Sequence, residues 1–275
     1  MSTHSKKRDG RCIPSFLLAL TLLGYAVGAC AAISFRGISQ NGTESGNLRI
    51  DKPAGTTADD VMIAAISWRP ASIDINPPSG WTLINREDQN AGNANAQAVY
   101  YRVAEGNERN RYQWKFKGGG PDGVAGGIIA YEGVDTGDPV DAWGANTTPN
   151  GLDHTANSIT TTVDDTRLIS TFSFSSASNW TAPSGQTERI DVGSVSSSDG
   201  GISLSMHDEA RPSSGTTGDR TATADGDDDT GVTHQIALTP ARENPGPGFC
   251  GPGRRFSDSF EDGSLAPWQS VGAGS

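Results

Sequence analysis

DDVMIAAISW at residues 59–68 and DTRLISTFSF at residues 165–174 are two versions of one pattern, 106 positions apart. Asp, Ile and Ser recur at matching positions, and the final Trp68 of the first copy corresponds to Phe174 in the second. Both copies are rich in β-branched and aromatic residues, which favour strands. A Pro-Ser-Gly turn follows each copy. The repetition predicts two similar halves, each containing a buried strand at this position.

The rest of the chain between residues 33 and 241 continues in short runs of strand-forming residues. The clearest is YQWKFK at residues 112–117, where aromatic side chains at alternate positions would face one side and polar ones the other. Gly, Pro, Asn, Asp and Ser fill the gaps between runs, as expected of turns. After residue 32, no stretch keeps a helical period for three turns. The pattern predicts an all-β protein.

Two copies are too few for a solenoid, and a half with an apolar face must bury that face against something. The other half is the obvious partner. We therefore expect a two-layer antiparallel β-sandwich, jelly-roll-like and built from two similar halves, over residues 32–241.

The N-terminus has the features of an export signal. Four basic residues precede a 15-residue apolar stretch at residues 13–27, and small residues follow at the cleavage site. We expect residues 1–31 to be a signal peptide. An alternative lies at Cys30, because Val27-Gly28-Ala29-Cys30 resembles a lipobox in which this cysteine is lipidated. The chain would then be secreted, or anchored at an outer surface through Cys30.

The charge and the cysteine content of the chain limit the classes of partner and ligand that it could bind. Removing the leader leaves 17 basic and 31 acidic residues, a net charge of −14. Such a surface repels phosphate backbones and anionic lipids, so we expect no nucleic-acid partner and no membrane contact except through a lipid anchor. Only Cys250 remains beyond the leader region, which leaves no partner for an intramolecular disulfide or for a zinc motif.

Several segments together resemble a known module. They are residues 50–56, the strand at 60–68, the turn at 77–83, and the strands at 99–103 and 127–135. As a set they resemble a β-sandwich module of bacterial surface, secreted and phage-tail-like proteins, over roughly residues 33–240. The resemblance implies a sandwich fold and an extracellular setting. It implies no catalytic residues.

The C-terminal region differs in composition from the body. Residues 242–255 are rich in Gly and Pro and have the character of a linker. Residues 256–275 resemble the opening of a lectin-like jelly-roll segment that is incomplete at Ser275. This neighbour suggests presentation of another module as one role for the sandwich.

Two candidate sites stand out by residue type. Alternating carboxylates at Asp225, Asp227 and Asp229 could supply oxygen ligands to Ca²⁺ in an irregular loop, although a solvated acidic loop also explains them. Trp143 and Trp180 fall in loop-like contexts, where an exposed indole could stack on a sugar ring. Anchoring of loops against the sandwich is the alternative for both tryptophans.

These observations favour a non-catalytic extracellular β-sandwich protein for adhesion, surface structure or module presentation, with an extracellular glycan or cell-surface component as its partner. A carbohydrate-binding module is the first alternative. An exported hydrolase with an unrecognised carboxylate site is the second. No cofactor is expected apart from the Ca²⁺ considered above.

Overall fold

A computed structural model describes residues 32–118, 120–194, 201–226 and 228–242. Within these ranges every regular element is a strand, which confirms the all-β prediction. No helix in the described ranges could cross a membrane. The predicted signal peptide, Cys30, the C-terminal segment 256–275 and nearly all of the 242–255 linker lie outside the described residues.

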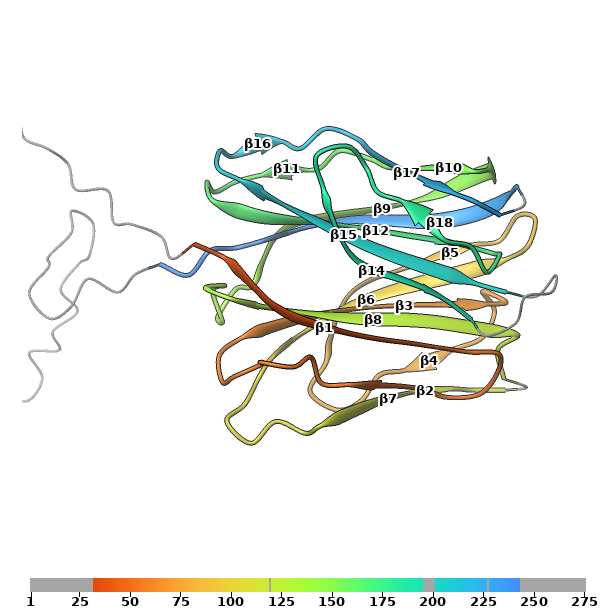
Figure 1. Cartoon of the computed structure of the whole chain (residues 1–275), viewed down its shortest axis with the longest axis horizontal. Coiled ribbons are helices and arrows are strands. Elements are labelled where there is room, and N and C mark those ends of the chain that lie inside the picture. The colour runs from red at the N-terminus through yellow and green to blue at the C-terminus, as the bar shows by residue number, and fades with distance from the viewer. Residues whose placement is uncertain (1–31, 119, 195–200, 227, 243–275) are drawn as a thin grey trace, which may run out of the picture.

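Two antiparallel five-stranded sheets form the centre of the molecule (Figure 1). The first has the order β1 (Ser34–Thr43), β8 (Gly123–Glu132), β3 (Val61–Arg69), β6 (Asn95–Val103) and β5 (Thr82–Gln89). The second has the order β14 (Thr187–Gly193), β15 (Ser203–Arg211), β12 (Thr166–Phe174), β18 (Asp229–Leu238) and β9 (Val140–Gly151). These two sheets face each other across a shared apolar core.

Smaller sheets cover the outer faces of this central pair. The first five-stranded sheet is covered by β2 (Leu48–Asp51), β7 (Arg111–Phe116) and β4 (Ile75–Asn76), in that order. The second is covered by β10 (Asp153–Ala156), β17 (Arg220–Ala224) and β13 (Trp180–Thr181), and by the pair β11 (Thr160–Thr161) and β16 (Gly215–Thr216). Figure 1 shows the resulting stack, with β2 and β7 at one side and β10, β17 and β16 at the other.

The two halves of the chain have the same strand arrangement. β3 and β12 each hold the middle of a five-stranded sheet, and the sheets β2-β7-β4 and β10-β17-β13 occupy equivalent outer positions. Asp59 and Asp165, which precede these central strands, both adopt a positive φ, at 67° and 59°. Gly80 and Gly185 supply a positive φ in the two Pro-Ser-Gly turns, where most other residues would be strained. The expected sandwich of two similar halves is confirmed.

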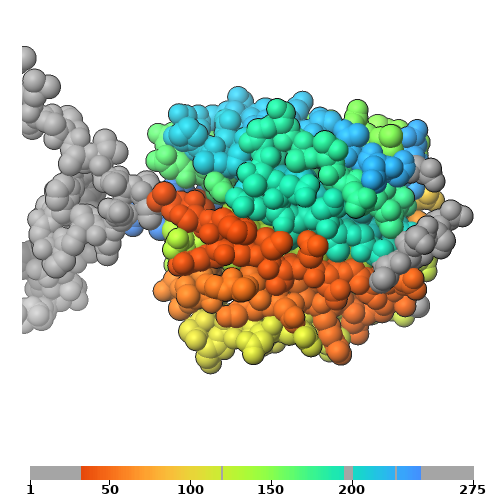
Figure 2. All heavy atoms as spheres, in the orientation of Figure 1, coloured from red at the N-terminus to blue at the C-terminus, as the bar shows by residue number. Residues whose placement is uncertain are grey.

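The number of layers is larger than the two expected, because the central strands are apolar on both faces. In β3, Met62, Ile66 and Trp68 point into the outer core under β2 and β7, whereas Val61 and Ile63 point to the other half. A strand with two apolar faces needs a cover on each. Each half is therefore a small sandwich of its own, and the two halves together have four layers. Figure 2 shows the atoms of the second half, mostly green to blue, lying over those of the first half, mostly red to yellow.

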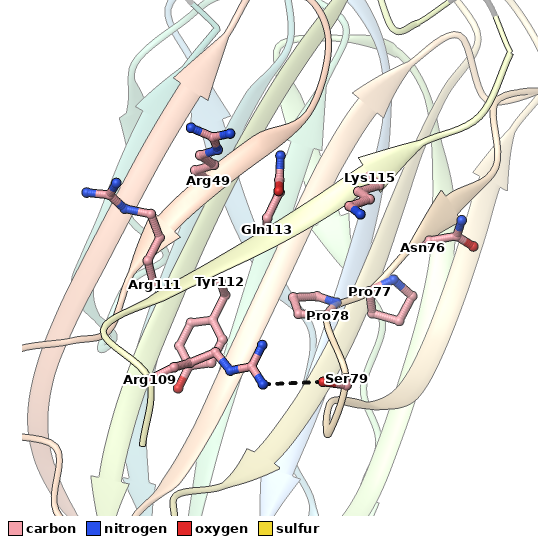
Figure 3. Close-up of a pocket in the computed structure, with 10 residues that line it drawn as sticks. All are labelled: Arg49, Asn76, Pro77, Pro78, Ser79, Arg109, Arg111, Tyr112, Gln113 and Lys115. Carbon is pink, nitrogen blue, oxygen red and sulfur yellow. Dashed lines mark hydrogen bonds between the residues drawn. The ribbon is translucent and has the colours of Figure 1, made fainter. Parts of the chain in front are cut away.

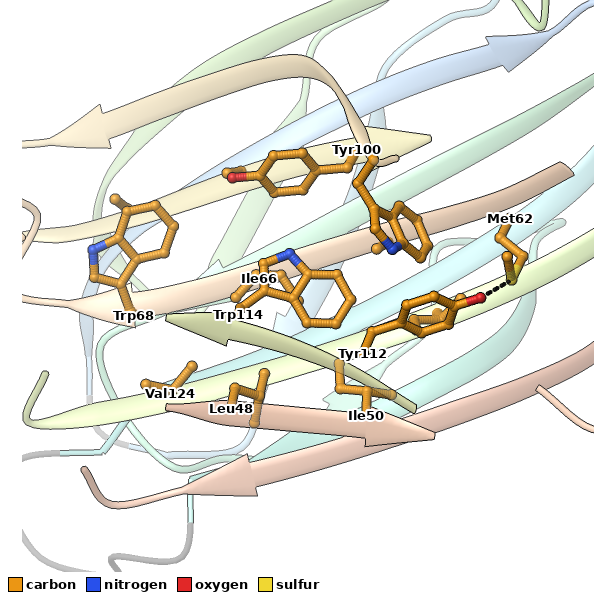
Figure 4. Packing of buried hydrophobic residues seen from close by; sticks show 14 of the residues in the cluster. Leu48, Ile50, Met62, Ile66, Trp68, Tyr100, Tyr112, Trp114 and Val124 are labelled. Atoms are coloured by element: carbon orange, nitrogen blue, oxygen red, sulfur yellow. Dashed lines mark hydrogen bonds between the residues drawn. The ribbon is translucent and has the colours of Figure 1, made fainter. Parts of the chain in front are cut away.

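The outer core of the first half is built around aromatic side chains (Figure 4). The rings of Trp81 and Tyr112 meet edge to face at 5.1 Å between centroids, and Trp81 lies 5.5 Å from Trp114. Tyr112 and Trp114 come from β7 and are fully buried. Aromatic pairs of this kind contribute roughly 0.5–1.5 kcal/mol beyond their burial. They hold the thin outer sheet firmly on the larger one.

Polar side chains join the halves inside the central core. Gln97 of β6 accepts hydrogen bonds from Thr171 of β12 at 2.5 Å and from the His234 ring at 2.6 Å, and its amide donates to Ser67 at 3.1 Å. All four residues are at most 1 % exposed. Unpaired buried polar groups are costly, so this network fixes one alignment of the two sheets.

A buried ion cluster joins the halves at another point. Both carboxylate oxygens of Asp208 on β15 are used, by Arg189 at 3.0 Å and by Arg167 at 3.2 Å. Tyr131 of β8, in the other half, donates its hydroxyl to the same carboxylate at 2.7 Å. The Asp208 side chain has no solvent exposure. This cluster links β8 of one half to β12, β14 and β15 of the other.

Candidate ligand-binding groove

A large cavity lies on the outer face of the first half (Figure 3). Its volume is about 700 Å³. It is formed by strands of the β2-β7-β4 sheet together with residues 77–79 and Arg109. Its lining residues are Arg49, Asn76, Pro77, Pro78, Ser79, Arg109, Arg111, Tyr112, Gln113 and Lys115. We call this cavity the basic groove.

The floor of the basic groove follows from the alternation along β7. Tyr112 and Trp114 point inward and are buried, so Arg111, Gln113 and Lys115 point outward. This confirms the predicted orientation of the 112–117 run. Arg49 of β2 lies opposite Gln113, and Asn76 of β4 lies opposite Lys115, which widens the polar face on both sides.

One wall of the basic groove is the Pro-Ser-Gly turn at residues 78–80. Arg102 holds this turn by donating to the Ser79 carbonyl at 3.4 Å, and it forms an ion pair with Glu108 at 2.8 Å. Burial alone would raise the pKa of Glu108, but the hydrogen bond from Arg102 and other favourable contacts lower it below its ordinary value. The next residue, Arg109, reaches the Ser79 hydroxyl at 3.4 Å. The wall is therefore fixed by a largely buried ion pair.

The charge of the groove contrasts with that of the whole chain. Its lining contains four cations, of which Arg111 pairs with Asp51 at 2.5 Å. The hydrogen bond from Arg111 lowers the pKa of Asp51. Among the described residues, neither Arg49 nor Lys115 forms an ion pair. The groove is thus a cationic surface on an acidic protein.

The two halves of the chain also differ in their net charge. Residues 33–135 carry ten basic and twelve acidic residues, whereas residues 136–241 carry four and fifteen. A second, smaller cavity of about 440 Å³ lies across β1 and β2 and shares Arg49 and Arg111 with the groove. Its other lining residues are Ser39, Gln40, Asn41 and Asp51, so these two arginines are the cations that face both cavities.

The two tryptophans predicted as sugar-stacking residues have different environments. Trp180 is only 6 % exposed, stacks near Phe172 and Phe174, and donates its indole N–H to Ser203 at 3.1 Å. A ligand cannot stack on this covered ring, so the prediction for Trp180 is wrong and the anchoring alternative holds. Trp143 lies on the edge strand β9 and is 47 % exposed. It is accessible, but it lies in the other half from the basic groove.

The acidic residues predicted as calcium ligands have protein partners of their own. Asp225 accepts hydrogen bonds from the backbone and side chain of Asn179, which lower its pKa. Asp229 is 7 % exposed and accepts from Asn93 at 2.6 Å and from the Thr230 N–H at 2.7 Å. Asp227 lies outside the described residues. Among the described residues, no group of three or more His, Cys, Asp or Glu side chains could hold a metal ion.

The histidines at 154, 207 and 234 are all buried. Burial lowers the pKa of His154 and of His207 to about 4, and that of His234 to about 3. These rings are therefore neutral near pH 7 and are out of reach of a substrate in solution. We call them the three buried histidines.

The basic groove was not among the sites predicted from the sequence, although one of its strands was. Gln113, Lys115 and Lys117 were expected to face water as the polar side of a strand. The sequence alone does not reveal that Arg49 and residues 76–79 lie beside this strand in the folded protein. The contrast between the charges of the two halves would have been a useful clue.

Three kinds of comparison with known proteins give the same result. No family model, no curated protein and no solved structure matches this chain. The function is therefore argued from the fold and from the basic groove.

Proposed function

We propose that this chain is a non-catalytic, exported β-sandwich protein that serves in adhesion, with the basic groove as its contact to an extracellular ligand. The observation that carries the proposal is a cavity of about 700 Å³ whose cations project from strands fixed by an aromatic core. A surface of this kind is ready to bind without rearrangement, which lowers the entropic cost of binding.

The groove lining supports binding rather than catalysis. Its ten lining residues include no histidine, cysteine or carboxylate that could act as a general base or nucleophile at neutral pH. The three buried histidines are neutral and enclosed in the cores. Asp51, a carboxylate beside the groove, is held by Arg111.

The proposed extracellular setting rests on the signal-like segment at residues 1–31 and on the resemblance to bacterial surface and secreted modules. Mass spectrometry of the mature N-terminal peptide tests it. A chain that begins at Ala32 indicates cleavage and release, and an acylated Cys30 indicates a surface anchor. A mature protein that retains Met1 through Ala31 would refute export.

The binding role is tested with a glycan array. It is also tested by adding the labelled full-length protein to cells and measuring how much protein they bind. We expect binding to a surface component that is reduced by the double variant Arg49→Gln/Lys115→Gln. A matched control, Arg211→Gln/Arg242→Gln, removes the same charge from outside the groove and should leave binding unchanged. Equal binding by wild type and both variants would refute the groove as the contact site.

A carbohydrate-binding module centred on Trp143 is the second candidate. The specific observation is that this indole is 47 % exposed on an edge strand, where a sugar ring could stack on it. Trp143→Ala should then abolish glycan binding while Arg49→Gln/Lys115→Gln leaves it intact. The opposite pattern favours the groove.

A further inference from the structure

We infer that the basic groove takes an acidic polysaccharide, a chain of sugars that bear carboxylate or sulfate groups. The inference rests on the proposed function, because it names the ligand class for the same groove. It is carried by the separation of the cations, by the neutral groups between them, and by the pairing of Asp51 with Arg111.

The separation of the cations favours an extended polyanion. Arg111 and Lys115 are four residues apart on β7, which corresponds to about 13 Å along a strand. Arg49 lies between them on the neighbouring strand, opposite Gln113. A single small anion could contact only part of this row. A polymer with a charge on each repeating unit could contact all three cations at once.

The neutral groups between the cations favour a sugar chain over other polyanions. Asn76, Ser79 and Gln113 offer amide and hydroxyl groups that can exchange hydrogen bonds with sugar hydroxyls. Pro77 and Pro78 add a small apolar surface for the C–H face of a sugar ring. A ligand made only of charged groups would leave these features unused.

The same groove is poorly suited to nucleic acid. Single strands bind by stacking their bases on aromatic side chains, but the rings of Tyr112 and Trp114 are buried beneath the groove floor. An acidic peptide could satisfy the cations, but it makes less use of the hydroxyl-binding groups.

Asp51 has a distinct place in this inference. Its carboxylate pairs with Arg111 at 2.5 Å and its side chain is 61 % exposed, so a ligand carboxylate or sulfate would compete with it for the same guanidinium. Replacing Asp51 with Asn removes the competitor and its repulsion of an incoming anion. This variant should therefore bind an acidic polysaccharide more tightly, a gain that a damaged fold would not produce.

The test uses the full chain and three soluble polymers: alginate, which carries carboxylates, dextran sulfate, which carries sulfates, and neutral dextran. Affinity is measured by biolayer interferometry for wild type, Asp51→Asn, Arg49→Gln/Lys115→Gln and the control Arg211→Gln/Arg242→Gln. We expect wild type to bind at least one acidic polymer and not dextran. The double groove variant should bind about tenfold more weakly, as two exposed ion pairs are lost.

Salt gives an independent readout. Raising NaCl from about 50 mM to about 200 mM should weaken wild-type binding strongly and that of the double groove variant less, because screening acts on the lost contacts. Stronger binding of alginate than of dextran sulfate would identify carboxylates as the preferred group, and the reverse would identify sulfates.

Other outcomes separate the inference from the proposed function. Binding of neutral dextran or of neutral array glycans that the groove variant abolishes would support the groove as an adhesive site and overturn the acidic ligand. Preference for polyglutamate over both acidic polysaccharides would also overturn it in favour of an acidic peptide. Failure to bind any polymer, array glycan or cell surface would refute the proposed function as well.

Discussion

Replacing Asp208 with Asn tests whether the buried ion cluster holds the two halves together. The substitution keeps the shape of the side chain and removes the charge that Arg167 and Arg189 share. It also weakens the acceptor of the Tyr131 hydroxyl. Breaking a buried ion pair by removing one partner typically destabilises by about 3–5 kcal/mol. The two arginine side chains are 15 % and 19 % exposed, so water compensates in part.

We therefore expect Asp208→Asn to lower the free energy of unfolding by about 2–4 kcal/mol, which for a domain of this size corresponds to a fall in Tm of roughly 5–15 °C. Tyr131→Phe removes one hydrogen bond and leaves the ion pairs, so about 1–2 kcal/mol is expected. Urea unfolding followed by tryptophan fluorescence measures both. The control Asp122→Asn makes the same chemical change at an exposed side chain and should stay within about 0.5 kcal/mol of wild type.

The reasoning would be refuted if Asp208→Asn cost less than about 1 kcal/mol or no more than Asp122→Asn. That result would mean that the apolar core alone fixes the two sheets. A loss larger for Tyr131→Phe than for Asp208→Asn would contradict the account in another way, because the hydroxyl would then matter more than the charges.

Three further predictions follow from burial and partners. The three buried histidines have a folded-state pKa below the ordinary value of about 6.5, so the unfolded chain binds more protons in acid. In urea titrations, stability should be complete above about pH 7 and fall from about pH 6.5 down to about pH 4, by up to about 1.4 kcal/mol per pH unit for each ring, with a smaller slope in His207→Gln. A flat profile would contradict this. Phe172→Ala should cost about 3–5 kcal/mol and Trp143→Ala less than about 1 kcal/mol by the same assay, and equal losses would contradict the assigned burial. Calcium or its chelator should leave Tm unchanged, because Asp225 and Asp229 are already hydrogen-bonded; a calcium-dependent rise would restore the metal site.

The fold class could be predicted because its signals are local. Alternation in the 112–117 run and the matching stretches 59–68 and 165–174 each depend on residues close in sequence, and both predictions are confirmed. The number of layers could not be predicted from the assumption that each half has a single apolar face. The strand at residues 61–68 is apolar at odd and even positions alike, and this pattern indicates a covering layer on each face.

The candidate site was harder to predict because its residues meet only through tertiary structure. Arg49, Ser79 and Lys115 come from three separate segments that β-pairing and one turn bring together. Trp180 shows the converse problem. Its Asn and Thr neighbours suggest a loop, yet Phe172 and His154 cover its ring in the folded protein. Local composition says little about which side of a sheet an aromatic ring will reach.

The ends of the described sandwich lie together, and this determines how the molecule would bear a pulling force. Ala32 and Ala241 both lie beside Gly133, the first close to its Cα and the second donating its N–H to the Gly133 carbonyl at 2.8 Å, and Figure 1 shows both ends leaving at one side. A pulling force applied between these two ends would not load the contacts between the stacked sheets. It would first peel the edge strand β1 from β8, one hydrogen bond at a time, while β18 stays held between β12 and β9. Tension between the groove and the C-terminal end would instead enter through β18 and pass through the aromatic core beneath β7, so the molecule should resist a load on its ligand best when it is held by its C-terminal end.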